Sequence, residues 1–354
     1  MSDPNSTLGQ GEAGDAGDAA RSADAAAEPI LSVRELEKYY PVQSGILGRQ
    51  TGAVQAVDGV SFDLERGETL AVVGESGCGK STMAETLIGL NDPTGGEIRF
   101  RGKSVGGNVD KAFRRDVQMV FQDPFATLNE RMTVGRIVAE PLIIHGERED
   151  DRAAYVRELL DTVGLSGEDH YEAFPHELSG GQRQRVGIAR ALALNPSMVV
   201  ADEPVSALDV SIKAGILQLL EQLQDEFGLT YLLITHDMSV VRQVADRVAV
   251  MYLGELVEVG PVEELFADPQ HPYTEALLSS VPRVTADPQP DNRIQLPGSP
   301  PDPVQPPSGC RFHTRCHLRE RLDQDEAVRC VDEDPELRAV DGRELACHFR
   351  PDHE

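Results

Sequence analysis

The sequence predicts an α/β protein built around a largely parallel sheet. From Ile30 onward, short β-branched runs alternate with stretches of helical periodicity, the order expected when helices connect parallel strands. Three compact apolar runs are of the kind that is buried on both faces of such a sheet: TLAVV (69–73), SMVVA (197–201) and TYLLIT (230–235). A glycine-rich stretch, GESGCGKS, follows the first run directly and leads into a helical stretch.

The segments around these strands differ in composition. Residues 1–28 contain Gly, Ala, Asp and Ser but hardly an apolar side chain larger than Ala, so we expect a disordered acidic tail. Helical patterns dominate between about 123 and 195, which predicts a helical subdomain inserted between strands of the sheet. After Pro261 the pattern changes, and the proline-rich QLPGSPPDPVQPPSG (295–309) is a predicted linker to a small cysteine-containing region.

Length and charge narrow the class of protein. The 354 residues, 40% of them apolar, suffice for one large or two moderate domains. No apolar run approaches the roughly 18 residues that span a bilayer, and the N-terminus lacks the basic-then-apolar order of a secretory signal. We therefore expect a cytosolic protein whose membrane role would come through partners. The net charge of −27 argues against nucleic acid as the main ligand, because phosphate backbones are bound by basic surfaces.

The acidic composition supports a further hypothesis. Only five lysines occur, and an acidic, lysine-poor surface resembles that of halophile proteins, whose self-repulsion is screened by molar salt. The alternative is an acidic surface that only keeps the protein soluble.

The stretch GESGCGKS (74–81) matches the phosphate-binding pattern G-x-x-x-x-G-K-[ST] between a strand and a helix. Its glycines allow a tight turn whose N–H groups cradle phosphates; Lys80 reaches the β- and γ-oxygens, and the hydroxyl of Ser81 is placed for Mg²⁺. Cys78 is interpreted as a small filler and not as a catalytic thiol, because no base is evident beside it. The predicted nucleotide-binding residues of this stretch are Gly74, Ser76, Gly77, Cys78, Gly79, Lys80, Ser81 and Thr82.

Two further motifs suit phosphate chemistry. VVADEP (199–204) ends a buried strand with two carboxylates: Asp202 can hold Mg²⁺, while Glu203 can orient an attacking water as a general base. Taken alone, this pair could also be a solvated turn. LSGGQ (178–182) begins a helix with exposed N–H groups at the positive end of the helix dipole, which suits an anion such as phosphate.

The succession of these motifs, with Gln122 in MVFQDP, SALD (206–209) and His236 in ITHD, resembles the ATP-binding cassette (ABC) ATPases over about residues 30–282. The resemblance implies a P-loop NTPase cassette with a RecA-like core, an antiparallel β-subdomain and an inserted helical subdomain, here residues 29–265. In this family two cassettes face head to tail, and the LSGGQ of one closes over the nucleotide of the other. Residues expected in the partner's site are Ser179, Gly180, Gly181 and Gln182, while Asp209 would organise the dimer interface.

The same resemblance implies roles for individual side chains. Gln122 would contact Mg²⁺ and the attacking water and sense the transporter subunit, and His236 would hydrogen-bond the γ-phosphate. Tyr40 aligns best with the aromatic residue that stacks on adenine, with Tyr39 as the fallback and core packing as the alternative for either. The implied cofactors are ATP and Mg²⁺, with Mg²⁺ held by Ser81, Gln122 and Asp202. The implied catalytic set is Glu203, His236, Gln122 and Lys80.

HPYTEALLSSVP (271–282), followed by a proline-rich stretch and a cysteine tail, resembles the ATPase subunits of dipeptide and oligopeptide importers, with residues 266–354 as their C-terminal extension. This implies an ATP-hydrolysing subunit that powers peptide import and is peripheral at the cytoplasmic face of the cell membrane. Its partners would be two membrane permease subunits, contacted by residues 123–134, a second and related ABC ATPase chain, and an extracellular solute-binding protein. Nickel importers share much of the pattern, so the ATPase of a nickel or other solute importer remains an alternative, as do a non-transport ABC ATPase and an inactive regulatory subunit.

Four of the five cysteines lie in the C-terminal extension: Cys310, Cys316, Cys330 and Cys347. A cytosolic chain is not expected to hold two stable disulfides, so four thiols in a short region indicate a metal site. Their spacing lacks the CxxC pairs typical of zinc sites. The likeness of GCRFHTRC (309–316) to the peptide-importer extension implies a [4Fe–4S] cluster, with zinc and a metal-free reduced tail as the alternatives.

Overall fold

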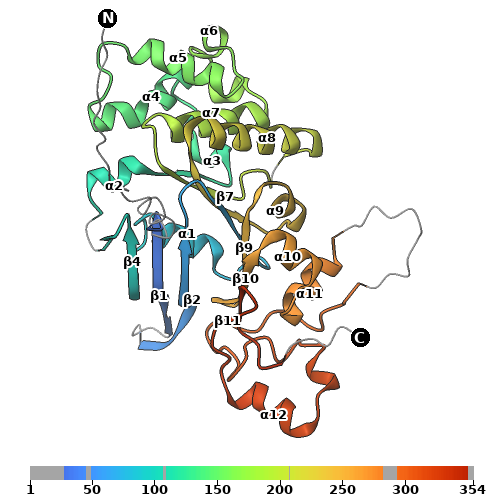
Figure 1. Ribbon diagram of the computed structural model, residues 1–354. Helices are drawn as coiled ribbons and strands as arrows, with labels where there is room; N and C mark the ends of the chain where they lie inside the picture. Colours follow the sequence, from blue (N-terminus) through green and yellow to red (C-terminus); the bar gives the residue numbers. More distant parts are fainter. Residues whose placement is uncertain (1–27, 45–48, 107–108, 207, 282–292, 350–354) are drawn as a thin grey trace, which may run out of the picture.

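The computed structural model describes residues 28–44, 49–106, 109–206, 208–281 and 293–349 (Figure 1). The predicted disordered tail, residues 1–28, lies outside the described residues apart from Glu28.

The main sheet has eight strands in the order β11-β12-β10-β9-β3-β8-β7-β6. Its middle and one side, from β9 to β6, are parallel. The α/β prediction is confirmed, and the three apolar runs form neighbouring strands that are buried along their whole length. The strands are β3 Thr69–Val73, β6 Val117–Val120, β7 Met198–Asp202, β8 Thr230–Thr235, β9 Arg247–Tyr252 and β10 Glu255–Pro261.

A second, antiparallel sheet lies beside the first and has the order β2-β1-β4-β5. Its strands are β1 Leu31–Ser44, β2 Arg49–Leu64, β4 Gly95–Phe100 and β5 Lys103–Ser104. Helix α1, Lys80–Leu87, shares one buried core with both sheets: Phe62 of β2, Leu70 of β3 and Met83 of α1 belong to the same cluster. Burying these side chains together fixes β2 against the phosphate loop that precedes α1.

The helices between β6 and β7 gather at one end of the molecule (Figure 1). They are α3 Pro124–Thr127, α4 Val134–His145, α5 Arg152–Thr162, α6 Gly167–His170 and α7 Gly180–Leu192. Helix α7 begins with a reciprocal cap, in which the Ser179 hydroxyl accepts from the Gln182 N–H at 3.3 Å and the Gln182 side chain accepts from the Ser179 N–H at 2.9 Å. The sequence Ser-Gly-Gly-Gln thus fixes where this helix starts.

The other helices flank the sheets or connect their strands. They are α2 Lys111–Asp116, α8 Val210–Phe227, α9 Met238–Val244, α10 Val262–Ala267, α11 Pro272–Ser279 and α12 Gln324–Asp332.

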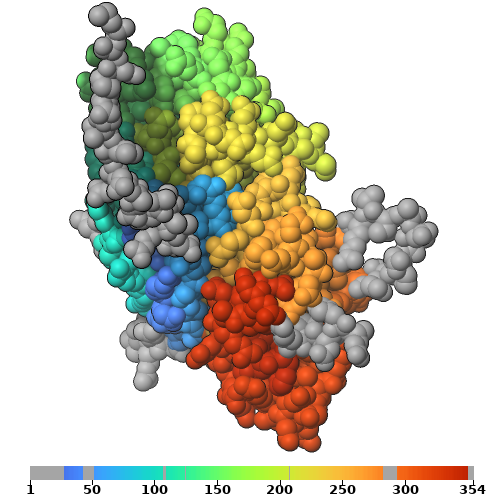
Figure 2. All heavy atoms as spheres, viewed as in Figure 1, coloured from blue at the N-terminus to red at the C-terminus, as the bar shows by residue number. Residues whose placement is uncertain are grey.

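The C-terminal region extends the main sheet. Strand β12, Arg343–Leu345, pairs with β10, and β11, Arg338–Val340, pairs with β12. In the space-filling view this region, coloured red, packs against both the blue and the orange parts of the chain (Figure 2). The predicted boundary at residue 265 therefore separates segments that share one hydrogen-bonded sheet.

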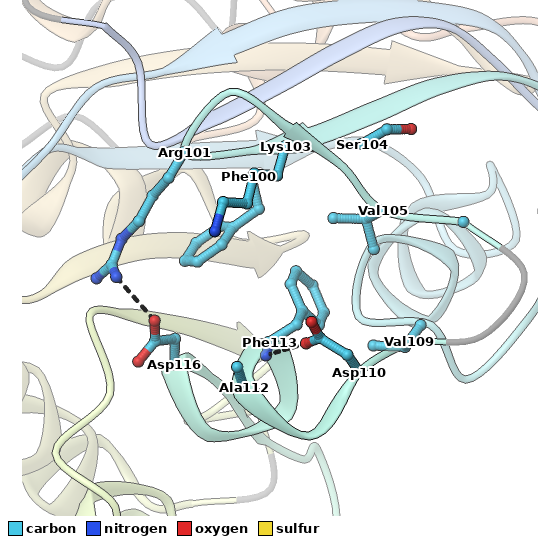
Figure 3. Close-up of a pocket in the computed structure, with 11 residues that line it drawn as sticks. Phe100, Arg101, Lys103, Ser104, Val105, Val109, Asp110, Ala112, Phe113 and Asp116 are labelled. Carbon is cyan, nitrogen blue, oxygen red and sulfur yellow. Dashed lines mark hydrogen bonds and ion pairs between the residues drawn. The ribbon is translucent and has the colours of Figure 1, made fainter.

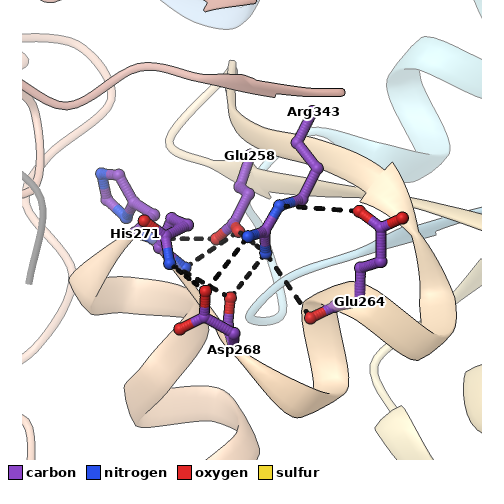
Figure 4. A network of polar contacts seen from close by, with 6 residues as sticks. Glu258, Glu264, Asp268, His271 and Arg343 are labelled. Atoms are coloured by element: carbon purple, nitrogen blue, oxygen red, sulfur yellow. Dashed lines mark hydrogen bonds and ion pairs between the residues drawn. The ribbon is translucent and has the colours of Figure 1, made fainter. Parts of the chain in front are cut away.

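A buried arginine, Arg343, links β12 to residues on and after β10. The side chain of Arg343 is 8% exposed; it donates to the Asp268 carbonyl oxygen at 2.5 Å and lies 3.8 Å from the carboxylate of Glu258, which is fully buried (Figure 4). Glu258 in turn accepts from the backbone N–H groups of Gln270 and His271. Because each buried charge has partners, the network can hold the C-terminal strand in register with β10.

Candidate nucleotide site

The predicted phosphate loop, residues 74–79, connects β3 to α1. Gly79 caps the helix with φ of 111°, and a Cβ there would lie 1.9 Å from the carbonyl oxygen of Ala56 in β2. Only glycine permits both this backbone conformation and this approach of two segments. The loop is therefore held in place by β2 as well as by its own turn.

Lys80, the first residue of α1, reaches back to the loop. Its ammonium donates to the carbonyl oxygens of Gly74 at 2.8 Å and Glu75 at 3.0 Å, and the residue is 5% exposed. Cys78 is also buried and lies 3.7 Å from this ammonium; burial raises the pKa of its thiol. These contacts place a positive charge at the loop that the sequence predicts to cradle phosphate.

The Ser81 hydroxyl and the Asp202 carboxylate lie side by side. The Ser81 hydroxyl donates to the Asp202 carboxylate at 3.2 Å, from the start of α1 to the end of β7. Burial raises the pKa of Asp202, and the hydrogen bond from Ser81 opposes that shift. A hydroxyl beside a partly buried carboxylate matches the oxygen ligands that Mg²⁺ prefers.

Glu203, directly after β7, contacts side chains that follow the two neighbouring strands, β6 and β8. One carboxylate oxygen accepts from the Gln122 amide at 2.9 Å, and the other lies 2.9 Å from Nδ1 of His236. Its backbone has φ of 45°, and its N–H donates to the Ile234 carbonyl of β8. A non-glycine residue in this left-handed region is strained, which is common where a side chain must be aimed. The adjacent carboxylates thus face different partners.

Except for Asp202, these groups line one open cavity of about 770 Å³, large enough for a nucleotide. Tyr40 also lines it; the residue is 37% exposed, and the Lys38 ammonium lies 5.0 Å from its ring centre. Tyr39 instead donates its hydroxyl to Asp58. The cavity is lined by Tyr40, Val54, Gln55, Ala56, residues 74–82, Gln122, Glu203, His236, Leu253, Leu277 and Pro303.

The LSGGQ residues and Asp209 lie elsewhere. Ser179 to Gln182 start α7, Asp209 precedes α8, and neither group is among the described residues that line the cavity. Gly181 approaches α8 closely, because a Cβ would lie 2.6 Å from the Ile212 side chain. The structure therefore separates this motif from the chain's own phosphate loop.

The four C-terminal cysteines surround one narrow void of about 20 Å³, room for about one water molecule. Burial raises the pKa of Cys310 and of Cys347 to about 12 each. All are free thiols. Within the described ranges, no three His, Cys, Asp or Glu side chains are close enough to share a single metal ion.

No role was predicted for Glu75 of the phosphate loop or for the two residues that contact it, Tyr273 and Arg315. Tyr273 accepts a hydrogen bond from the backbone of Glu75, and Arg315 pairs with the carboxylate of Glu75. The motifs HPYT and GCRFHTRC contain Tyr273 and Arg315, but neither motif indicates that its residue reaches a loop 198 or 240 positions earlier.

A smaller cavity of about 230 Å³ lies between β4, β5 and α2 (Figure 3). Phe100 and Phe113 meet edge to face there with ring centres 5.3 Å apart, and Arg101 pairs with Asp116 at 2.8 Å. None of the predicted site residues lines it, so it has no place in the candidate site.

Comparison with protein families gives two matches. The family model of the ABC transporter matches residues 57–206. The model of the oligopeptide/dipeptide transporter C-terminal region matches residues 257–321.

Curated proteins resemble the chain over most of its length. The oligopeptide transport ATP-binding protein AppF of Bacillus subtilis (strain 168) is 50% identical over 330 residues, covering 91% of this chain and 98% of AppF. The dipeptide transport ATP-binding protein DppF of Escherichia coli (strain K12) is 47% identical over 90% of this chain and 94% of DppF.

Solved structures share the fold. CbiO1 from Clostridium perfringens, part of the ABC transporter complex cbiONQ, has a TM-score of 0.58 at 31% identity, covering 68% of this chain and 91% of cbiO1. The dimeric ATP-binding cassette MJ0796 bound to ADP and Pi has a TM-score of 0.58 at 32% identity, covering 66% of this chain and 98% of MJ0796.

Proposed function

Since the chain belongs to the ABC transporter ATPases, in their oligopeptide and dipeptide branch, we propose that it hydrolyses ATP to power peptide import through a membrane permease. One observation carries the proposal: Lys80, Ser81 and Glu203 with its two partners line a single nucleotide-sized cavity, and Ser81 donates a hydrogen bond to Asp202. Identity of 47% to 50% over nearly the full length of two peptide-transport relatives supports the solute class.

ATP fits the cavity through its phosphates and its base. The Lys80 ammonium now bound by two loop carbonyls would turn to the β- and γ-phosphates, while the loop N–H groups hold the remaining oxygens. The place of Tyr40 in the lining of the cavity supports its role in stacking on adenine. Ser81 and Asp202, with Gln122, would hold Mg²⁺, which supplies charge neutralisation for the phosphates.

Glu203 is the proposed general base. Gln122 and His236 hold its carboxylate from both sides, so its remaining lone pairs can accept a proton from a water beside the γ-phosphate. His236 would donate to the γ-phosphate, and Gln122 would orient the water. Both partners lie at strand ends on either side of Glu203, so the base is positioned by the rigid sheet.

The LSGGQ residues are proposed to act on the nucleotide of a second, related cassette. The capped start of α7 leaves N–H groups at the positive end of a 13-residue helix, away from the chain's own cavity. Asp209 would lie at the interface. MJ0796, a relative of similar fold, is dimeric with ADP and Pi bound.

The partners follow from the branch of the family. A peptide importer requires membrane permease partners; we propose two of them, with a solute-binding protein outside and this chain at the cytoplasmic face. In the part of the chain that the structure describes, no helix has the length and apolarity to cross a bilayer. The segment just after Gln122 is proposed to contact the permease, and its Phe125 is 56% exposed.

A [4Fe–4S] cluster on the four C-terminal cysteines is also proposed. Thiolates are the ligands of such clusters, and all four thiols here face one void within a short region. A cluster spaces its four ligands farther apart than a single ion does. An anaerobically prepared sample that is brown and carries iron and sulfide would support the cluster; a colourless sample with stoichiometric zinc, or with no metal, would overturn it.

Adaptation to high salt is the proposed reason for the acidic surface. The net charge of −27 repels itself strongly at low ionic strength. We expect the free energy of unfolding to rise between dilute buffer and molar KCl. Full folding and activity in dilute buffer would contradict this adaptation.

Reconstitution tests the function. The chain, its permease subunits and its partner cassette are placed in liposomes with the solute-binding protein, and ATP turnover is measured with peptides or with nickel complexes. We expect peptides to stimulate turnover and Lys80→Ala to abolish it. Stimulation by nickel alone would replace the peptide proposal with a metal importer, and co-purification with ribosomes or DNA would contradict transport.

A further inference from the structure

Glu75, the second residue of the phosphate loop, is held at three points. Its carbonyl oxygen accepts from Lys80 at 3.0 Å, and its N–H donates to the hydroxyl of Tyr273 at 2.8 Å. Its carboxylate is paired through both oxygens with the guanidinium of Arg315, at 2.7 and 3.1 Å. Two of these three contacts come from the C-terminal part of the chain, 198 and 240 residues away.

Arg315 is fixed by its surroundings. Its side chain is 6% exposed, its Nε donates to the Pro297 carbonyl at 3.2 Å, and Nη1 lies 3.5 Å from the hydroxyl of Tyr252. A buried guanidinium needs a carboxylate partner, and Glu75 lies on both of its outer nitrogens. The pair is therefore a rigid link between the C-terminal region and the loop.

Tyr273 is fixed equally well. It is fully buried, and its ring packs against those of Tyr252 at 4.7 Å and Phe312 at 5.3 Å between centres. Phe312 belongs to the same C-terminal segment as Arg315. One aromatic cluster thus sets the position of both groups that hold Glu75.

The charge of Glu75 gives this link a consequence for nucleotide binding. Glu75 lines the same cavity that is proposed to receive the phosphates, where an unpaired negative charge would repel a triphosphate. Arg315 neutralises it with a side chain that does not itself line the cavity. The described contacts of Arg315 do not include Asp202, Glu203 or His236, so we expect the link to affect nucleotide binding and not the hydrolysis step.

We propose that Arg315 and Tyr273 are positioning residues for the phosphate loop, so that the C-terminal extension sets the affinity for ATP through Glu75. The inference rests on the proposed ATPase function but concerns only how tightly the loop holds its nucleotide. It also assigns a physical role to the tyrosine of the HPYT motif.

The test measures binding of a fluorescent ATP analogue and steady-state hydrolysis, with the full-length chain in its transporter complex. Arg315→Gln leaves the Glu75 charge unpaired, so Kd and KM should rise about tenfold while kcat stays within about twofold. In Glu75→Gln/Arg315→Gln a neutral pair replaces the charged one, and most of the lost affinity should return. Tyr273→Phe should raise Kd less, because it removes one hydrogen bond and keeps the packing.

Arg343→Gln is the matched control. Arg343 is also a buried arginine of the C-terminal region and is paired with a carboxylate, but its contacts lie at the sheet edge and not at the loop (Figure 4). We expect this variant to unfold at lower temperature with unchanged Kd. If it weakens ATP binding as much as Arg315→Gln does, the extension acts only through general stability and the proposal fails.

Two other outcomes are decisive. An unchanged Kd in Arg315→Gln overturns the proposal, as does a double variant that binds no better than Arg315→Gln. If Arg315→Gln does not fold, Arg315→Lys keeps the charge without the two-point geometry; it should raise Kd about threefold, and an unchanged Kd there contradicts positioning. A wild-type complex that binds no ATP would refute the proposed function instead.

Discussion

Replacing Glu203, the proposed general base, with glutamine is expected to separate ATP binding from hydrolysis. The two contacts of Glu203 can survive the change: the new amide oxygen accepts from Nδ1–H of His236, and the new amide nitrogen donates to Gln122 once that amide rotates. The groups proposed to hold the phosphates are Lys80 and the loop, and the described hydrogen bonds of the Lys80 ammonium do not include Glu203. Geometry and affinity should therefore be retained while the base is lost.

The size of the effect follows from what is removed. A positioned general base contributes about 10²–10⁴ in rate. This corresponds to about 3–5 kcal/mol of activation free energy. We expect kcat of Glu203→Gln to decrease by a factor of about 10²–10⁴. The Kd for ATP should change by less than about threefold, since only a transition-state interaction is lost.

The assay is single-turnover hydrolysis of radiolabelled ATP beside equilibrium binding of the same nucleotide. Glu203→Asp serves as the comparison, because it keeps a carboxylate but withdraws it from both partners; its rate should lie between those of the wild type and Glu203→Gln. Hydrolysis by Glu203→Gln within about threefold of the wild type would show that another group is the base.

Three further changes test other parts of the structure. Gly79→Ala forces a Cβ toward the Ala56 carbonyl, so thermal denaturation should show a loss of at least about 1–3 kcal/mol; an unaltered midpoint would contradict the close approach. Tyr40→Ala should weaken ATP about tenfold in calorimetry but leave tripolyphosphate binding unchanged, because only base stacking is lost; equal effects on both ligands would exclude stacking. Burial, with a smaller effect of His317, lowers the pKa of His271 to about 3, so the unfolded chain alone gains this proton as pH falls below 6.5. The free energy of unfolding should then fall by about 1.4 kcal/mol per pH unit from this residue, and urea titrations of His271→Asn should lack that part of the slope.

Much of the fold could be predicted because the relevant signals are local. The apolar runs at β3, β7 and β8 are continuous, and the glycine pattern at residues 74–79 is enough to predict the turn there. The strands at the sheet edge could not be found this way. Strand β12 is three residues long and pairs with β10 some 85 positions earlier, and no periodicity in so short a segment indicates a partner.

The sequence by itself determined the kinds of chemical group and their order: a lysine loop after a buried strand, two carboxylates at the end of another, and a capped Ser-Gly-Gly helix start. Each depends on neighbouring residues, so a linear pattern can encode it. The folded structure was needed to show that Tyr40 lines the cavity while Tyr39 does not, and that Tyr273 and Arg315 hold Glu75. Such contacts are made when distant segments bury their apolar surfaces together, and that packing brings the side chains within reach of each other.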